Sequence, residues 1–270
     1  MFKACFKKDF FEQIRTGKFF IFLALGVGIC VLSILSTFLI STIMQNVDFS
    51  GLGEFAGEFE GLISNDYAAS LNYFMSYMIS YFTIVVICMI MNTIGKEIKQ
   101  KKWIAPMCSG VKPESMILSK ILVTTLAVIV SVIAACLIHF VFTIIIFEPS
   151  KTLSIGKMFA CYGCYILFMI FTVVVTMSIN AITKKAWVSP TIMIIMLILG
   201  TSLMQTIKVA GEKTFIMYTP YAFYDLSYTL SSYAVMGALE WVISSLTFVV
   251  VSSLILLWAV KSNKIKASKN

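Results

Sequence analysis

The sequence predicts an all-α integral membrane protein with six transmembrane helices and both termini in the cytoplasm, and three observations support this. The chain of 270 residues is 59% hydrophobic and only 13% charged, whereas soluble domains hold roughly 45–50% apolar and about 25% charged residues. Its mean hydropathy is +0.93. Long apolar runs alternate with lysine-rich segments. This composition excludes a soluble enzyme, a disordered tail and a disulfide-stapled secreted module.

Six apolar segments are long enough to cross a hydrocarbon core of about 30 Å, which takes roughly 20 helical residues. They are Phe19–Ile43, Ser70–Ile94, Ser119–Phe147, Lys157–Ile182, Val188–Ile207 and Trp241–Val260. None contains an acidic residue, and their only lysines, Lys120 and Lys157, lie at segment ends. The segments predict a single transmembrane domain over residues 1–270.

The lysines set the predicted orientation, because cytoplasmic loops of membrane proteins carry an excess of Lys and Arg. With the N-terminus inside, 17 of the 21 basic residues fall in cytoplasmic segments and four fall outside. The first apolar run is too long for the core of a cleaved signal peptide and lacks an A-x-A site, so we expect it to be retained. Arg15 is the only arginine. The use of lysine in place of arginine at nearly every basic position is typical of an AT-rich bacterial genome. We therefore expect the protein in a bacterial cytoplasmic membrane.

An amphipathic helix is expected before the first span, within residues 1–18. Phe2, Phe6, Phe10 and Ile14 recur at intervals of four, and charged residues occupy most of the positions between them. Such a helix lies in the membrane interface with its apolar row towards the lipid. A merely basic start to the first span explains the lysines but not the phenylalanine row.

Two outer segments have distinctive compositions. The loop Met44–Ala69 holds five acidic residues and no basic one. It would attract a cationic substrate, although such a loop is more often a solvated face. Residues 208–240 hold seven tyrosines and phenylalanines together with Pro220, and are too polar to span and too aromatic for a free loop. We expect a re-entrant or interfacial aromatic hairpin there, before the last span.

The cytoplasmic loop 95–118 has the composition of a docking surface. Lysines accompany Trp103, Ile104 and Met107, which we expect to be exposed, and Ser109-Gly110 ends a short helix before Pro113 starts the next. Lysines bound to anionic lipid would give a similar charge but would not need the tryptophan or the restart at proline. The residues expected to contact a partner are Glu97, Lys101, Lys102, Trp103, Met107 and Ser109.

Small polar residues recur at helical spacing in three spans. They are Ser33, Thr37 and Ser41 in the first span, Asn72, Ser76, Ser80 and Thr83 in the second, and Thr172, Thr176, Asn180 and Thr183 in and just after the fourth. Such rows are most often packing seams between membrane helices. They also suit a path for an amphipathic substrate, and both interpretations stay open because a path at a subunit seam would use both.

The sequence lacks the residues that several kinds of functional site require. No Gly-Lys pair is followed by Ser or Thr, so the chain has no P-loop for ATP. His139 is the only histidine, and we interpret it as a hydrogen-bonding link between helices. Cys161-x-x-Cys164 lies in an apolar helix and is interpreted as structural. No carboxylate lies in a span centre, which disfavours ion-coupled transport. No catalytic residue, cofactor or metal is expected on this chain.

Taken together, these features resemble the membrane subunits, or permeases, of ATP-binding cassette (ABC) transporters of the type-2 exporter class. The resemblance covers the whole chain: the amphipathic start Phe2–Arg15, six spans with both ends inside, and an aromatic hairpin before the last span. The closest local match is Lys96-Glu97…Trp103-Ile-Ala-Pro-Met-Cys-Ser-Gly…Ser119-Lys120-Ile-Leu. It is similar to the family's loop, in which an acidic residue and a short Leu/Pro-containing stretch precede a lysine that opens the third helix.

The resemblance implies an exporter built from two membrane subunits, identical or paralogous, and two cytosolic ATPases that bind ATP and Mg. The ATPases would push on residues 97–109 and on helix 2–15. The acidic outer loop and the polar rows fit a cationic or amphipathic antimicrobial peptide such as a bacteriocin, with lipid or drug as alternatives. The alternative functions are a secondary transporter or channel and a non-transporting immunity protein.

Overall fold

The computed structural model describes residues 2–44, 66–91, 93–149, 153–185, 187–210 and 238–267. Its helices in chain order are α1 (Phe2–Arg15), α2 (Lys18–Met44), α4 (Tyr67–Tyr77), the π-helix η2 (Met78–Phe82), α5 (Thr83–Ile90), α6 (Thr93–Lys99), α7 (Ile104–Cys108), α8 (Pro113–Ile146), α9 (Ile155–Thr183), α10 (Val188–Ala210) and α13 (Ala238–Ala267). Most of the predicted acidic loop and of the predicted aromatic hairpin lies outside the described residues.

Among the described residues, five helical segments are long and apolar enough to cross a membrane. They are Lys18–Ile43, Tyr67–Ile98, Pro113–Ile146, Ile155–Thr183 and Val242–Asn263. The apolar run described within α10, Val188–Leu199, is shorter than these five. The chain therefore has the helical, multi-pass character that its composition predicts.

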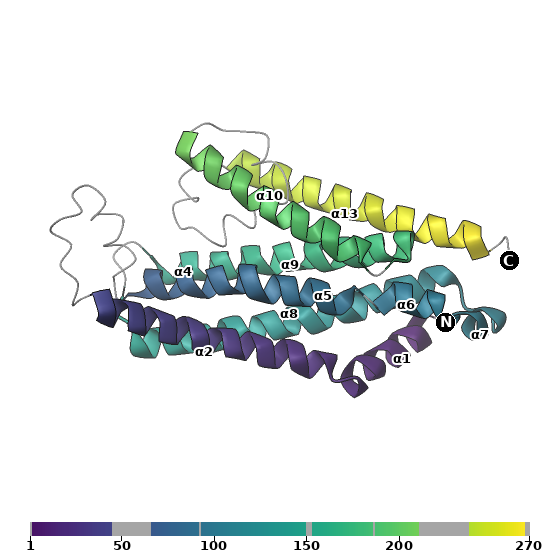
Figure 1. Cartoon of the computed structure of the whole chain (residues 1–270), viewed down its shortest axis with the longest axis horizontal. Coiled ribbons are helices and arrows are strands. Elements are labelled where there is room, and N and C mark those ends of the chain that lie inside the picture. The colour runs from purple at the N-terminus through teal and green to yellow at the C-terminus, as the bar shows by residue number, and fades with distance from the viewer. Residues whose placement is uncertain are drawn as a thin grey trace.

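The long helices run side by side in an elongated bundle (Figure 1), in which α8 and α9 are antiparallel whereas α2 runs parallel to α8 and α13 runs parallel to α9. α8 contacts α1, α2, α4, α9 and α13, and α9 contacts α5, α6, α10 and α13, so α8 and α9 form the centre of the bundle. α1 begins, and α13 ends, at the same end of the bundle as α6 and α7 (Figure 1). This end gathers the short helices and is the one described below.

The second apolar segment is not one continuous α-helix. Between α4 and α5 it widens into η2, where the carbonyl of Met78 accepts a hydrogen bond from the Tyr165 hydroxyl at 2.8 Å. The Thr83 hydroxyl donates to the same carbonyl at 3.2 Å. Side chains that supply such bonds stabilise a local departure from α-helical geometry. Contacts from α9 thus fix the shape of this segment.

His139 links three helices at the opposite end of the bundle. Its Nδ1 lies 2.7 Å from the Tyr162 hydroxyl of α9, and its Nε2 lies 3.1 Å from Ser70 Oγ of α4. The ring is fully buried and stacks on Phe74, with ring centroids 4.0 Å apart. The interpretation of His139 as a hydrogen-bonding link between packed helices is confirmed.

Candidate functional site

A buried ion cluster joins α1, α6 and α8. Lys120 Nζ lies 2.8 Å from Glu97 Oε1, 3.2 Å from Asp9 Oδ1 and 3.6 Å from Glu12 Oε2. Lys120, Asp9 and Glu97 are buried, and the Glu12 side chain is 43% exposed. We call these four residues the Lys120 cluster. One ammonium group on α8 therefore holds carboxylates from two other helices.

Two further hydrogen bonds extend the Lys120 cluster. The Ser119 hydroxyl of α8 donates to Asp9 Oδ2. The Trp103 indole N–H donates to Glu97 Oε2 at 3.0 Å, and Trp103 is the residue that precedes α7. The cluster thus connects the start of α7, through Glu97 and Lys120, to α1 and to the first turns of α8.

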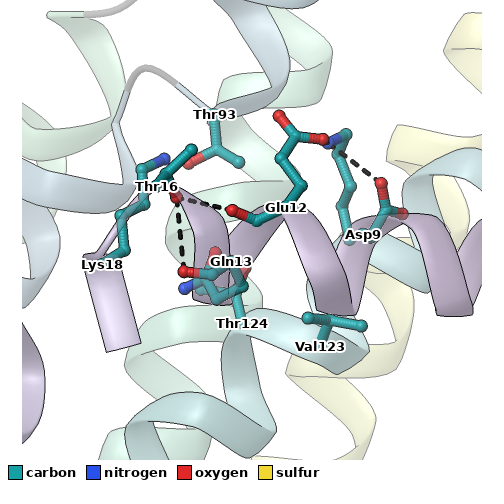
Figure 2. Close-up of a pocket in the computed structure, with 9 residues that line it drawn as sticks. Asp9, Glu12, Gln13, Thr16, Lys18, Thr93, Val123 and Thr124 are labelled. Carbon is teal, nitrogen blue, oxygen red and sulfur yellow. Dashed lines mark hydrogen bonds and ion pairs between the residues drawn. The ribbon is translucent and has the colours of Figure 1, made fainter. Parts of the chain in front are cut away.

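The polarity of α1 explains why its acidic residues face the bundle. Asp9 and Gln13 are its buried residues, and Figure 2 shows both on α1 around a small cavity shared with Val123 and Thr124 of α8. Four large apolar side chains of α1 are instead 38–57% exposed, namely those of Phe2, Phe10, Phe11 and Ile14. A helix with its polar side on the protein and its apolar side free matches the expected position in a membrane interface.

Asn180 of α9 forms hydrogen bonds with the backbone at the start of α6. The Gly95 backbone N–H donates to Asn180 Oδ1 at 2.6 Å, while Asn180 Nδ2 donates to the Met91 carbonyl and, at 3.3 Å, to Ser189 Oγ. A Cβ atom on residue 95 would lie 2.8 Å from Asn180 Oδ1, so this close approach requires glycine. The α6 helix is therefore fixed by α9 at its first turn and by Lys120 through Glu97.

The predicted docking residues divide into two groups. The expectation that Trp103 is exposed is wrong: only 6% of it is accessible, because its indole N–H bonds to Glu97, which itself pairs with Lys120. Glu97 is buried as well, and Met107 packs partly against the core. Of the predicted docking residues, Lys101, Lys102 and Ser109 are exposed, and so is the neighbouring Ile104. Ile104 is 53% exposed.

The predicted polar rows also divide by burial. At most 1% of each of the following residues is exposed: Ser33, Thr37, Thr83, Thr172, Thr176 and Asn180. They lie in seams between helices of this chain, as most polar residues of membrane helices do. Asn72 and Ser76 are partly exposed, Ser80 is exposed, and the neighbouring Tyr81 is 60% exposed. One polar and aromatic face of α4 and η2 therefore stays uncovered by the described residues.

Asp9, Glu12, Gln13, Ser119 and Lys120 belong to the site but were not predicted as site residues, although Ser119 and Lys120 stand in the local match to the exporter family. Two signals point to them. Asp9 and Glu12 are the only acidic residues in a basic segment, one helical turn apart and off the phenylalanine row. Lys120 lies in an apolar segment, where a charged side chain needs a partner. The sequence does not state which acidic residue meets Lys120, since the three pairs are distant along the chain.

The Asp9 carboxyl gives a pH-dependent prediction. Burial raises its pKa above the ordinary value of 3.8, and Lys120 and Ser119 oppose this rise. Its contribution to stability is therefore fully present below that value and is lost as the pH rises through the raised pKa. Asp9→Asn does not ionise. The melting temperatures of Asp9→Asn and of the wild type are measured in nanodiscs. We expect the variant's value minus the wild-type value to increase as the pH rises from 3.8 through the raised pKa of Asp9. A flat or falling difference would contradict the assignment.

No protein-family model matches this sequence, and no curated protein matches it either.

Proposed function

We propose that this chain is the membrane subunit of an ATP-driven exporter of the ABC type-2 class, driven by two cytosolic ATPases that bind ATP and Mg. Two such membrane subunits, identical or paralogous, form the translocation path in a bacterial cytoplasmic membrane. The proposal rests on the Lys120 cluster. It ties the loop after the second apolar segment, the amphipathic helix α1 and the start of α8 into one connected unit.

Such a connection is what an externally driven transporter needs. A partner shifts a membrane protein between states only through contacts that differ in the two states. A partner that pushes on Lys101, Lys102, Ile104 or Ser109 would load α6 and α7 first. The Glu97–Lys120 pair, at 2.8 Å, would pass that load to α8, and the Asp9–Lys120 pair, at 3.2 Å, would pass it to α1. Glu97 and Trp103 act in this proposal as internal links instead of as contact residues.

The proposed topology has six spans, with α10 as the fifth, and both termini in the cytoplasm. It is supported by the lysine distribution and by the position of the α1 start and the α13 end at one end of the bundle (Figure 1). An even number of crossings returns the chain to the side on which it began. In this topology α6 and α7 lie on the cytoplasmic side, where ATPases are found.

The uncovered face of α4 and η2 is the proposed wall of the path. Hydroxyl and amide groups on a helix face are unfavourable against lipid tails. Contact with a second membrane subunit, or with a substrate between the two, would remove that cost. Tyr81 and Ser80 on this face combine ring surface with hydroxyl groups, which fits an amphipathic substrate, such as a cationic antimicrobial peptide, better than a small ion.

Co-purification tests the proposal. The tagged chain, produced with its neighbouring genes, is expected to bring down an ATPase. The double variant Lys102→Glu/Ile104→Asp reverses one charge and removes one apolar contact on the accessible loop surface. We expect it to reduce the bound ATPase by at least about tenfold, since removing a central apolar anchor and a charge at an interface costs more than about 1.4 kcal/mol. Bound ATPase is quantified by mass spectrometry and by ATP hydrolysis.

A matched control is Lys261→Glu, which reverses an exposed lysine near the end of α13. It should retain the wild-type amount of ATPase. If the wild-type chain purifies without any ATPase, the exporter proposal fails, and a secondary transporter, a channel or a non-transporting immunity protein takes its place. If Lys261→Glu loses as much ATPase as the loop variant, the effect is one of general charge and the docking surface is not at the loop.

A further inference from the structure

A small polar cavity lies beside the Lys120 cluster, between α1 and the segments α2, α6 and α8 (Figure 2). Glu12, Gln13, Lys18 and Thr124 are among the residues that line it, and the space available to a water-sized occupant is about 20 Å³. A cavity holds a water molecule when this space exceeds roughly 10–15 Å³. The cavity therefore has room for an ordered water molecule.

Gln13 supplies the second observation. Its side chain lines this cavity and is only 8% exposed. Within the described part of the chain, its Nε2 atom is buried and has no hydrogen-bond partner. Buried amide groups of native proteins are nearly always satisfied by protein or by ordered water. The position of Gln13 thus calls for an acceptor inside the cavity.

The charges around the cavity limit what that acceptor is. An anion would be repelled by the carboxylates of Asp9 and Glu12. A metal cation would be repelled by the ammonium groups of Lys18 and Lys120 and by the amide N–H of Gln13. A neutral molecule that both accepts and donates hydrogen bonds avoids both conflicts. Water has this chemistry and this size.

We propose that the cavity binds one ordered water molecule, which accepts a hydrogen bond from Gln13 Nε2 and donates to a carboxylate of the Lys120 cluster. The water lies between α1 and α8, next to the Asp9–Lys120 ion pair that joins the same two helices. This site follows from the cavity and from Gln13 alone and does not depend on the proposed exporter function.

Solid-state NMR of the full chain in liposomes tests the site. The chain has four glutamines, Gln13, Gln45, Gln100 and Gln205, so nitrogen-15 labelling of glutamine side chains gives four amide signals. Gln13→Met removes one and assigns it, and sequential carbon–nitrogen correlations assign it if that variant does not fold. Magnetisation transfer from water is then measured with and without a soluble gadolinium chelate outside the protein.

The expected result combines two properties in one signal. The Gln13 amide should receive magnetisation from water and should keep its intensity when the chelate is added, whereas the exposed Gln100 should lose most of its intensity. A Gln13 signal that is protected but receives nothing from water means that the cavity is dry, and overturns the proposal. A Gln13 signal that broadens as Gln100 does means that the amide faces bulk solvent, and overturns it equally.

Discussion

Lys120→Met is expected to destabilise the folded chain by about 3–5 kcal/mol, the usual cost of removing one partner from a buried ion pair. The substitution leaves the buried carboxylates of Asp9 and Glu97 without the ammonium group that lies 3.2 and 2.8 Å from them. Methionine keeps the length and the apolar part of the side chain, so the loss is mainly one of charge. The free energy of unfolding is measured by denaturant titration in mixed micelles.

Two variants make this expectation specific. Lys112→Met removes an exposed lysine just before α8 and should change the free energy of unfolding by less than about 0.5 kcal/mol. The triple variant Asp9→Asn/Glu97→Gln/Lys120→Met removes the charges together and should recover most of the loss, because no buried charge is left alone. Equal losses in Lys120→Met and Lys112→Met would show that the Lys120 cluster does not hold the three helices together.

Asn180→Leu is the second large effect, with an expected loss of about 2–4 kcal/mol. Leucine has a similar size but leaves the Gly95 N–H and the Met91 carbonyl without their side-chain partner. Each buried polar group left unsatisfied costs about 1–3 kcal/mol, and values towards the lower end are usual for membrane helices. The same denaturant titration measures it.

Thr176→Val is the matched control on the same helix. Thr176 is as deeply buried as Asn180, but its hydroxyl bonds to the Thr172 carbonyl of its own helix. Its loss should stay below about 1 kcal/mol, since the carbonyl keeps its helical partner. A loss for Asn180→Leu no greater than that for Thr176→Val would mean that Asn180 does not fix the start of α6.

Much of this architecture could be predicted from the sequence, because bilayer thickness converts hydropathy into helix length. The described long helices lie where the apolar runs predict them. The row of phenylalanines predicts the exposed side of α1, and His139 predicts a link between helices. These features depend on local composition and spacing, which the sequence displays directly.

The sequence alone was a poor guide to exposure within the loop 95–118. Trp103 is an expected surface residue by its lysine-rich neighbourhood, yet it is buried against Glu97. The helical spacing of the polar rows likewise does not predict which rows are buried between helices and which one stays uncovered. In both cases the outcome depends on which other helix covers the side chain.

What the sequence determined by itself is therefore a predominantly helical membrane protein with a basic, amphipathic start and a distinctive loop after its second apolar segment. Only the tertiary structure decided that Asp9, Glu97 and Lys120 meet. These three residues are separated by at least 23 positions along the chain, and no periodicity relates them. A buried charge requires a partner but does not specify its place in the sequence, and the packing of α1 and α6 on α8 makes that choice.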